Sequence, residues 1–264
     1  MKIRTIAFNT FGSFLRNKVI LLFCSLFVCI VLLMMSPLLA YKTMINTANA
    51  QQMQGFVLNE VAAVMSLVSG FGSLLAAWAA ADSVAGEMKS GTILAVMARP
   101  LHRWQFLAGK YFGVLLLMAV YVTAMLGVTF LLAWLGGQRF HTSLWTLFVY
   151  PMVRYAVWAA IALFLVTLVH PVFVMAIVVV LATLIRLFAT ASSRIPAWVR
   201  LPVHLTLPLT NLLSEDRFLT ITRASLKPYP WTNHLTALAY GLDYALLCFL
   251  LAAVVFQRRS LSRD

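Results

Sequence analysis

Charged residues are scarce in this sequence. Asp, Glu, Lys and Arg make up 10% of the 264 residues, and only seven of these residues are acidic. A soluble globular domain carries roughly a quarter charged residues. Hydrophobic residues instead reach 62% of the chain, which is more than such a domain holds. The composition therefore excludes an ordinary soluble domain.

Clustered metal ligands and paired thiols are also missing. All three cysteines fall inside apolar runs, so the sequence predicts neither a disulfide framework nor a thiolate metal site. The five histidines are dispersed, without an i,i+4 pair or a nearby carboxylate suited to zinc. We therefore predict that the chain binds no metal.

No nucleotide site or catalytic group is recognisable. A phosphate-binding loop needs Gly five residues before its Gly-Lys pair and Ser or Thr after it. At Gly109-Lys110 those positions hold Trp104 and Tyr111. The stretch "SGFGSLL" does not supply the turn of an intramembrane serine protease. We predict no catalytic residue, no ATP site and no cofactor bound by this chain.

Apolar runs of about twenty residues, enough to cross a hydrocarbon core of about 30 Å, are what the sequence does contain. The first run is too long for the apolar region of a signal peptide. We predict an all-α polytopic membrane protein, a single domain over residues 1–264. Its six transmembrane helices lie at residues 19–41, 61–81, 106–135, 147–169, 172–191 and 235–256.

The positive charge predicts the orientation. Six spans place both termini on one side, and that side carries eleven of the 20 Lys and Arg residues. Loops rich in Lys and Arg remain cytoplasmic. We therefore expect a bacterial inner-membrane protein. Its two termini and the loop at residues 82–105 are expected on the cytoplasmic side. The net charge of +13 then reflects topology and contact with membrane lipid, not nucleic acid.

Two stretches outside the spans have patterns of their own. Residues 1–18 place apolar side chains at helical spacing between basic ones, which predicts an amphipathic helix in the cytosolic interface rather than a solvated terminus. Residues 192–233 hold five of the nine prolines and form a long extracytoplasmic loop. This loop is long enough to meet an extracytoplasmic partner.

Small residues and a few charges mark the spans themselves. The second span carries a stripe of small residues that lets helices approach closely, namely Ser66, Gly70, Ser73 and Ala77. Ionisable residues within spans are costly and are usually paired or functional. Arg154, Arg186 and Asp243 lie at a similar depth, with Glu60 at the outer mouth of the second span. They either form one polar cluster, or each arginine extends alone to the outer interface.

The loop at residues 82–105 combines an acidic residue, a Gly-Thr pair, an apolar helical turn and an Arg-Pro pair, followed by a further arginine and "FLAGK". In this order, and with "LVTLVHPVFVMAIVV", "LPLTNLL" and "AAVVFQRRSL" further on, the chain resembles the permeases of type-2 ABC exporters. The residues that carry the resemblance in the loop are Glu87, Gly91, Thr92, Arg99, Pro100 and Arg103.

The resemblance implies a division of labour between chains. Such a permease pairs with a second copy or a paralogue, and two cytosolic ATPase subunits bind the ATP and Mg. A coupling helix in the loop between spans two and three, which "GTILAVMA" can supply, would dock on the ATPase. Arg99 and Arg103 would pair with carboxylates or lie under lipid phosphates. Glu87 would cap a helix, bind a lysine or lie in a solvated loop. The alternative is a non-transporting scaffold that transmits force to an extracytoplasmic partner.

Overall fold

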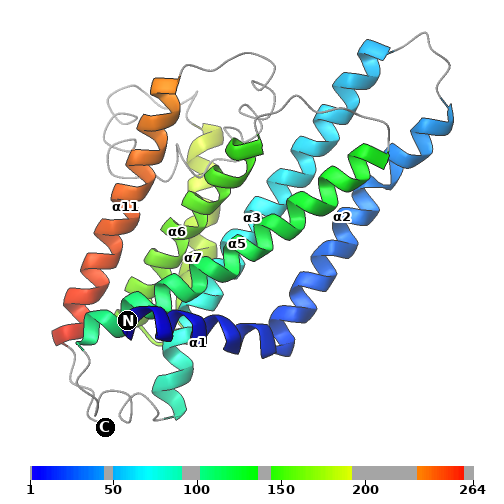
Figure 1. Cartoon of the computed structure of the whole chain (residues 1–264). Coiled ribbons are helices and arrows are strands. Elements are labelled where there is room, and N and C mark those ends of the chain that lie inside the picture. Colours follow the sequence, from blue (N-terminus) through cyan, green and yellow to red (C-terminus); the bar gives the residue numbers. More distant parts are fainter. Residues whose placement is uncertain (1, 45–49, 91–101, 136–143, 192–230, 259–264) are drawn as a thin grey trace.

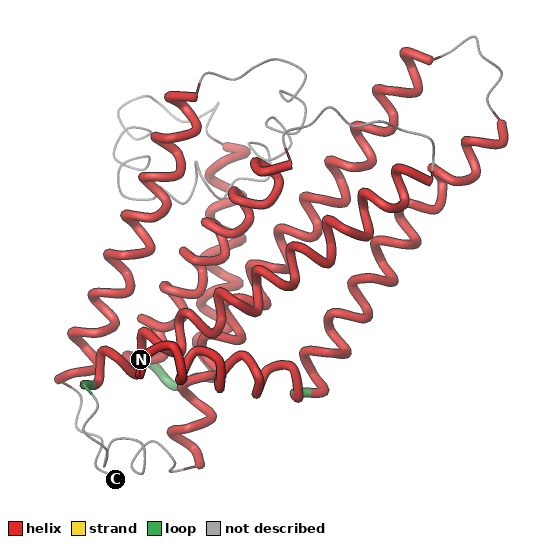
Figure 2. Tube along the Cα trace, in the orientation of Figure 1, coloured by secondary structure: helices red, strands yellow, loops and turns green. Residues whose placement is uncertain are grey.

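The chain folds into a bundle of helices, seen in a computed structural model that describes residues 2–44, 50–90, 102–135, 144–191 and 231–258 (Figure 1). Every regular element among these residues is a helix and none is a strand, as Figure 2 shows. The seven described helices are α1 (Lys2–Arg16), α2 (Lys18–Met44), α3 (Ala50–Ser90), α5 (Arg103–Leu135), α6 (Leu144–Leu168), α7 (Pro171–Ala191) and α11 (Trp231–Arg258).

Each of the six predicted apolar runs falls on one of these helices, to within one residue. Four of the described helices, α3, α5, α6 and α11, are long and apolar enough to cross a membrane. Helix α2 meets the same test only together with α1, and the apolar part of α7, Phe173–Leu184, is shorter. The described part of the chain therefore contains four membrane-span candidates, or five if α1 and α2 are one bent span.

A sharp bend separates α1 from α2. The two helices meet at 67°, so α1 lies across the end of the bundle while α2 runs along it (Figure 1). Asn17 lies at the bend: its backbone N–H donates to the Phe14 carbonyl (3.0 Å), and its side-chain oxygen accepts from the Val19 N–H (3.0 Å). An Asn side chain that bonds the N–H two residues on is a helix N-cap. The helix predicted at residues 1–18 is therefore present and ends where α2 is capped.

Helix α3 is longer than its predicted span. Its 41 residues correspond to roughly 60 Å, about twice the thickness of the hydrocarbon core. The loop predicted to begin at residue 82 is helical through Ser90, which corrects that boundary. No proline interrupts this part, and Ala85, Glu87 and Met88 are good helix formers. The predicted coupling helix lies outside the described residues, as does the predicted outer loop 192–233 up to residue 230. The ends of both predicted loops are corrected, because α5 begins at Arg103 and α11 at Trp231.

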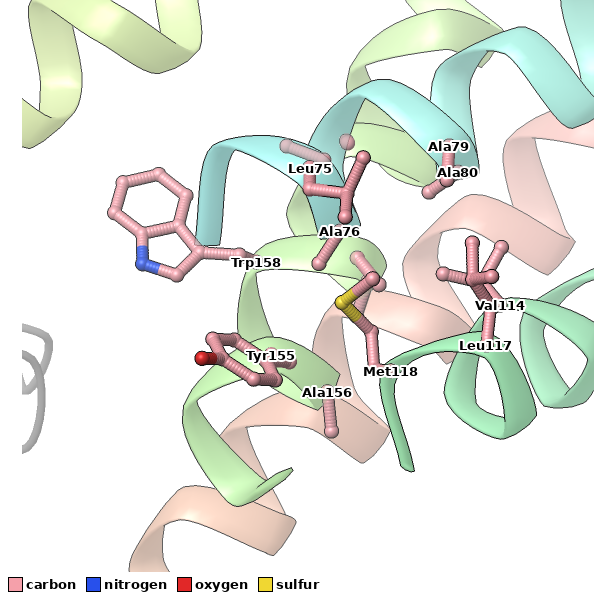
Figure 3. Close-up of a cluster of buried hydrophobic side chains, with 14 of the residues drawn as sticks. Leu75, Ala76, Ala79, Ala80, Val114, Leu117, Met118, Tyr155, Ala156 and Trp158 are labelled. Carbon is pink, nitrogen blue, oxygen red and sulfur yellow. The ribbon is translucent and has the colours of Figure 1, made fainter. Parts of the chain in front are cut away.

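The core is built around α6. This helix is the most buried of the four span candidates, and α11 is the least. Small residues allow α6 to be enclosed, because Ala159, Ala160 and Ala162 are fully buried between the neighbouring helices. Figure 3 shows its Tyr155 and Trp158 beside Ala76 of α3 and Met118 of α5. Large apolar side chains cover the outside of α2, α7 and α11, as in helices that face lipid.

A glycine in α3 allows the closest approach in this core. The hydroxyls of Tyr155 and Tyr121 both donate to the carbonyl oxygen of Val68, at 3.1 Å and 3.2 Å. One turn further along α3, Gly72 faces the two rings. A methyl group on Gly72 would overlap the Tyr155 hydroxyl and lie 2.8 Å from Tyr121 Cε1. The missing side chain therefore makes room for two tyrosines that tie α5 and α6 to α3.

Candidate functional site

The first three turns of α5, residues 103–113, lie at one end of the bundle and contact four other helices, namely α1, α3, α6 and α11. We call this the α1 end, because α1, the last turns of α3 and α11, and the start of α5 lie there together (Figure 1). Residues 91–101, which include the predicted coupling helix, join α3 to α5 at the same end. The contacts that hold this end together therefore lie next to that segment.

An ion pair joins α3 to α5 on the two sides of that segment. Lys110 Nζ of α5 binds Glu87 Oε1 of α3. The lysine side chain is 8% exposed and the glutamate side chain 27%, so the lysine is buried and the glutamate half-buried. The Lys110 ammonium also lies 5.6 Å from the ring centroid of Phe106. Of the three roles left open for Glu87, the structure shows the bond to a lysine.

Arg103 holds the end of α11. Its Nη1 donates to the backbone carbonyls of Gln257 (3.1 Å) and Phe256 (3.4 Å), in the last turn of that helix. A cation at a helix C-terminus satisfies carbonyls that have no partner within the helix and favours the negative end of the helix dipole. The ring of Phe106 stacks on that of Phe256, with centroids 6.2 Å apart. Arg103 thus has a role inside the chain that the sequence analysis did not predict.

Two glycines on α5 form the seat of α1. A methyl group on Gly109 would lie 2.5 Å from Ile6 Cγ2, and one on Gly113 would lie 2.7 Å from Thr10 Cβ. Their G-x-x-x-G spacing puts both on one face, where backbones can approach closely. The buried side chains of α1 are Ala7, Thr10 and Phe14. The apolar face of α1 therefore packs on α5 in addition to any contact with lipid. The stretch "GKYFG" is the sequence pattern that could have predicted this helix contact.

The other predicted site residues are placed less completely. Gly91, Thr92, Arg99 and Pro100 lie outside the described residues. Arg154 is buried in α6, whereas Asp243 of α11 is exposed and Glu60 of α3 is half-buried. For Arg186 only the backbone, in α7, is described. The polar cluster remains a prediction.

The stripe of small residues on α3 has a graded burial. Ser73 and Ala77 are buried, while Ser66 and Gly70 are half-buried. The Ser73 hydroxyl donates to the Ser69 carbonyl (2.7 Å) and the Ser66 hydroxyl to the Ala63 carbonyl (2.8 Å), so both polar groups are satisfied within the helix. Within the described ranges, no group of three or more His, Cys, Asp or Glu side chains could hold a metal ion.

Replacing Arg103 with Gln is expected to loosen the end of α11. The loss of a charged donor to two carbonyls costs about 1 kcal/mol at this half-buried position. Hydrogen–deuterium exchange of the amides at residues 254–258 should then accelerate about fivefold, which is that free energy converted to a rate ratio. The matched control is Arg4→Gln, since Arg4 lies over Phe8 on α1. Equal exchange in both variants would contradict this role.

The sequence was also compared with known protein families. The family described as "ABC-2 family transporter protein" matches residues 4–261. No curated protein sequence matches the chain.

Proposed function

The chain belongs to the ABC-2 transporter family, whose match covers nearly all of it, and we propose that it is the permease subunit of an exporter driven by a separate cytosolic ATPase. The family places the protein in the membrane as a transmembrane subunit of an ABC transporter. Export, the two permease and two ATPase copies, and coupling through residues 91–101 are our proposal.

One observation carries the coupling part of this proposal. The two helices that flank residues 91–101 are bound to each other by Lys110 and Glu87, and α5 is bound in turn to α1 and α11. A force applied to that segment therefore acts on helices that are already joined. This arrangement supports a docking site for an ATPase, because packed side chains, ion pairs and rigid helices can carry a displacement from one site to another.

The proposed topology has six spans, with both termini and residues 91–101 in the cytoplasm. Four described helices, α3, α5, α6 and α11, are long and apolar enough to span, and we count α2 and α7 as the other two. Basic residues gather at the α1 end, among them Lys2, Arg4, Arg16, Lys18 and Arg258. Loops and termini rich in Lys and Arg remain cytoplasmic, which supports this orientation.

In the proposed mechanism, ATP binding closes two ATPase subunits and shifts residues 91–101 of each permease. The helices joined at the α1 end carry this shift to the rest of the bundle. The bundle then exchanges between inward-facing and outward-facing arrangements, each favoured by a different nucleotide state of the ATPase. The substrate moves outward along a path between two permease copies, lined by parts of α3 and α7.

Charge reversal at Arg99 is the direct test of ATPase docking. We expect an Arg99→Glu variant, purified from its own host in mild detergent, to retain at least tenfold less ATPase than the unmodified chain. Losing one partner of an interfacial charge pair costs about 2–5 kcal/mol, which is more than tenfold in affinity. ATP hydrolysis in the eluates is the measurement. Arg99 is preferable to Arg103, whose guanidinium already binds α11.

The matched control is Arg139→Glu, which places the same charge change in the loop between α5 and α6, on the proposed outer side. This variant should retain the ATPase fully. If the unmodified chain is intact and arrives without an ATPase, the proposed function is wrong. If both variants lose it equally, docking does not depend on residues 91–101.

A further inference from the structure

The ion pair between Glu87 and Lys110 is unusual for its position. Glu87 lies three residues before the end of α3, and Lys110 lies in the second turn of α5. Helices α3 and α5 also pack through buried apolar side chains, among them Val84, Ala85 and Leu107, and the ion pair adds a polar contact to this packing. The pair therefore closes a loop at its base, directly next to the segment that would receive the ATPase.

Stability alone does not explain such a pair. A buried ammonium loses its hydration, and apolar side chains of similar size often stabilise a protein as well as a buried ion pair does. Lys110 is 8% exposed in a chain with only seven acidic residues, and one of them is placed against it. An ion pair constrains the two helices more than an apolar contact does, because the ammonium and the carboxylate oxygen must stay within bonding distance.

Lys110 is also flanked by contacts to the other helices. Gly109 and Gly113, on either side of it in sequence, hold α1, and the Tyr111 hydroxyl donates to the Ala156 carbonyl of α6 (3.0 Å). Arg103, two turns earlier, holds the end of α11. A displacement that reaches Lys110 is therefore passed to α1, α6 and α11 by contacts of the same helix.

We propose that Glu87 and Lys110 are positioning residues for energy coupling, and that their ion pair makes the ends of α3 and α5 move together when residues 91–101 are displaced. This inference rests on the proposed function. Without the pair, a force on the segment separates the two helix ends and leaves the membrane-embedded parts in place. With the pair, the same force moves both helices and, through α5, the rest of the bundle.

The test uses the full chain in complex with its ATPase in lipid nanodiscs. Cys24, Cys29 and Cys248 are replaced by Ser, and Val120→Cys on α5 carries an environment-sensitive fluorophore. Val120 is 50% exposed and lies ten residues beyond Lys110. The measurement is the change in fluorescence on adding MgATP with vanadate. We expect a clear change in this background and one reduced about fivefold in Glu87→Gln and in Lys110→Met, within the range of known coupling mutations.

Two double variants separate coupling from folding. The exchanged pair Glu87→Lys/Lys110→Glu should restore most of the fluorescence change. The apolar pair Glu87→Met/Lys110→Met should keep the Tm of the unmodified protein and still lose the change. Asp82→Asn, which removes a carboxylate from the same end of α3, is the matched control and should respond as the unmodified chain does.

Each remaining outcome counts against a different statement. If the apolar pair or Glu87→Gln responds fully while the ATPase stays bound, the ion pair is merely structural and the inference is overturned. It is overturned as well if the unmodified complex binds the ATPase but shows no fluorescence change. If no ATPase co-purifies with the unmodified chain, the proposed function fails instead.

Discussion

Replacing Gly72 with Ala is expected to destabilise the protein by about 2–3 kcal/mol, the cost of inserting a methyl group into a tightly packed core. The new methyl group would overlap the Tyr155 hydroxyl and crowd the Tyr121 ring. Tyr155 has no exposed surface and cannot turn away into solvent. Either both tyrosines lose their hydrogen bonds to Val68, or α3 moves away from α5 and α6.

The thermal unfolding midpoint in detergent is the measurement for Gly72→Ala. Gly127→Ala is the matched control, because a methyl group on Gly127 of α5 meets nothing within 4 Å. Since Ala favours a helix over Gly by up to about 1 kcal/mol, the control should keep or raise the Tm. A Gly72→Ala variant as stable as the control would show that the three helices do not pack as described.

Replacing Gly113 with Leu is expected to displace α1 from its seat. A methyl group at this position already approaches Thr10 Cβ to 2.7 Å and the Ala7 carbonyl oxygen to 3.0 Å, and the carbonyl belongs to the helix backbone and cannot rotate away. A leucine side chain therefore forces the two helices apart. When the helices separate, the packing of Phe14, which is 3% exposed, is lost.

The displacement is measured by maleimide labelling of a Thr10→Cys variant without other cysteines. Thr10 is 3% exposed, so labelling is slow while α1 is seated. Burial of one large apolar side chain contributes about 1.5–3 kcal/mol, so its loss should accelerate labelling roughly 10- to 100-fold. Gly127→Leu, on the same helix in open space, should leave the rate unchanged. Equal rates in the two leucine variants would place α1 elsewhere.

The two glycine predictions concern different functions of the same bundle. Gly72 lies at the centre and allows α3, α5 and α6 to form a rigid core. Gly109 and Gly113 lie at the α1 end and join α1 to α5 beside the ion pair. If the proposed coupling route is correct, Gly113→Leu should leave the core intact. It should still reduce the displacement of α2 on ATP binding, because α2 continues from α1 at Asn17.

The helices and the class of protein could be predicted from the amino-acid sequence alone. Each apolar run predicted one helix, and the amphipathic pattern at residues 1–18 predicted α1. The order of motifs around residues 82–110 indicated the family that the match over residues 4–261 then showed. These features are local: a span needs a fixed length of apolar residues to cross a hydrocarbon core, and an amphipathic helix needs only its own periodicity.

Which helix faces meet could be seen only in the tertiary structure. The sequence allowed Glu87 to cap a helix or to bind a lysine, and the fold selected Lys110, 23 positions away. It likewise placed Arg103 on the end of α11 and the small faces of Gly72, Gly109 and Gly113 against tyrosines and α1. Such contacts depend on how whole helices fit against one another. In lipid this fit follows from close packing and hydrogen bonds, because lipid gives no hydrophobic driving force for helices to associate.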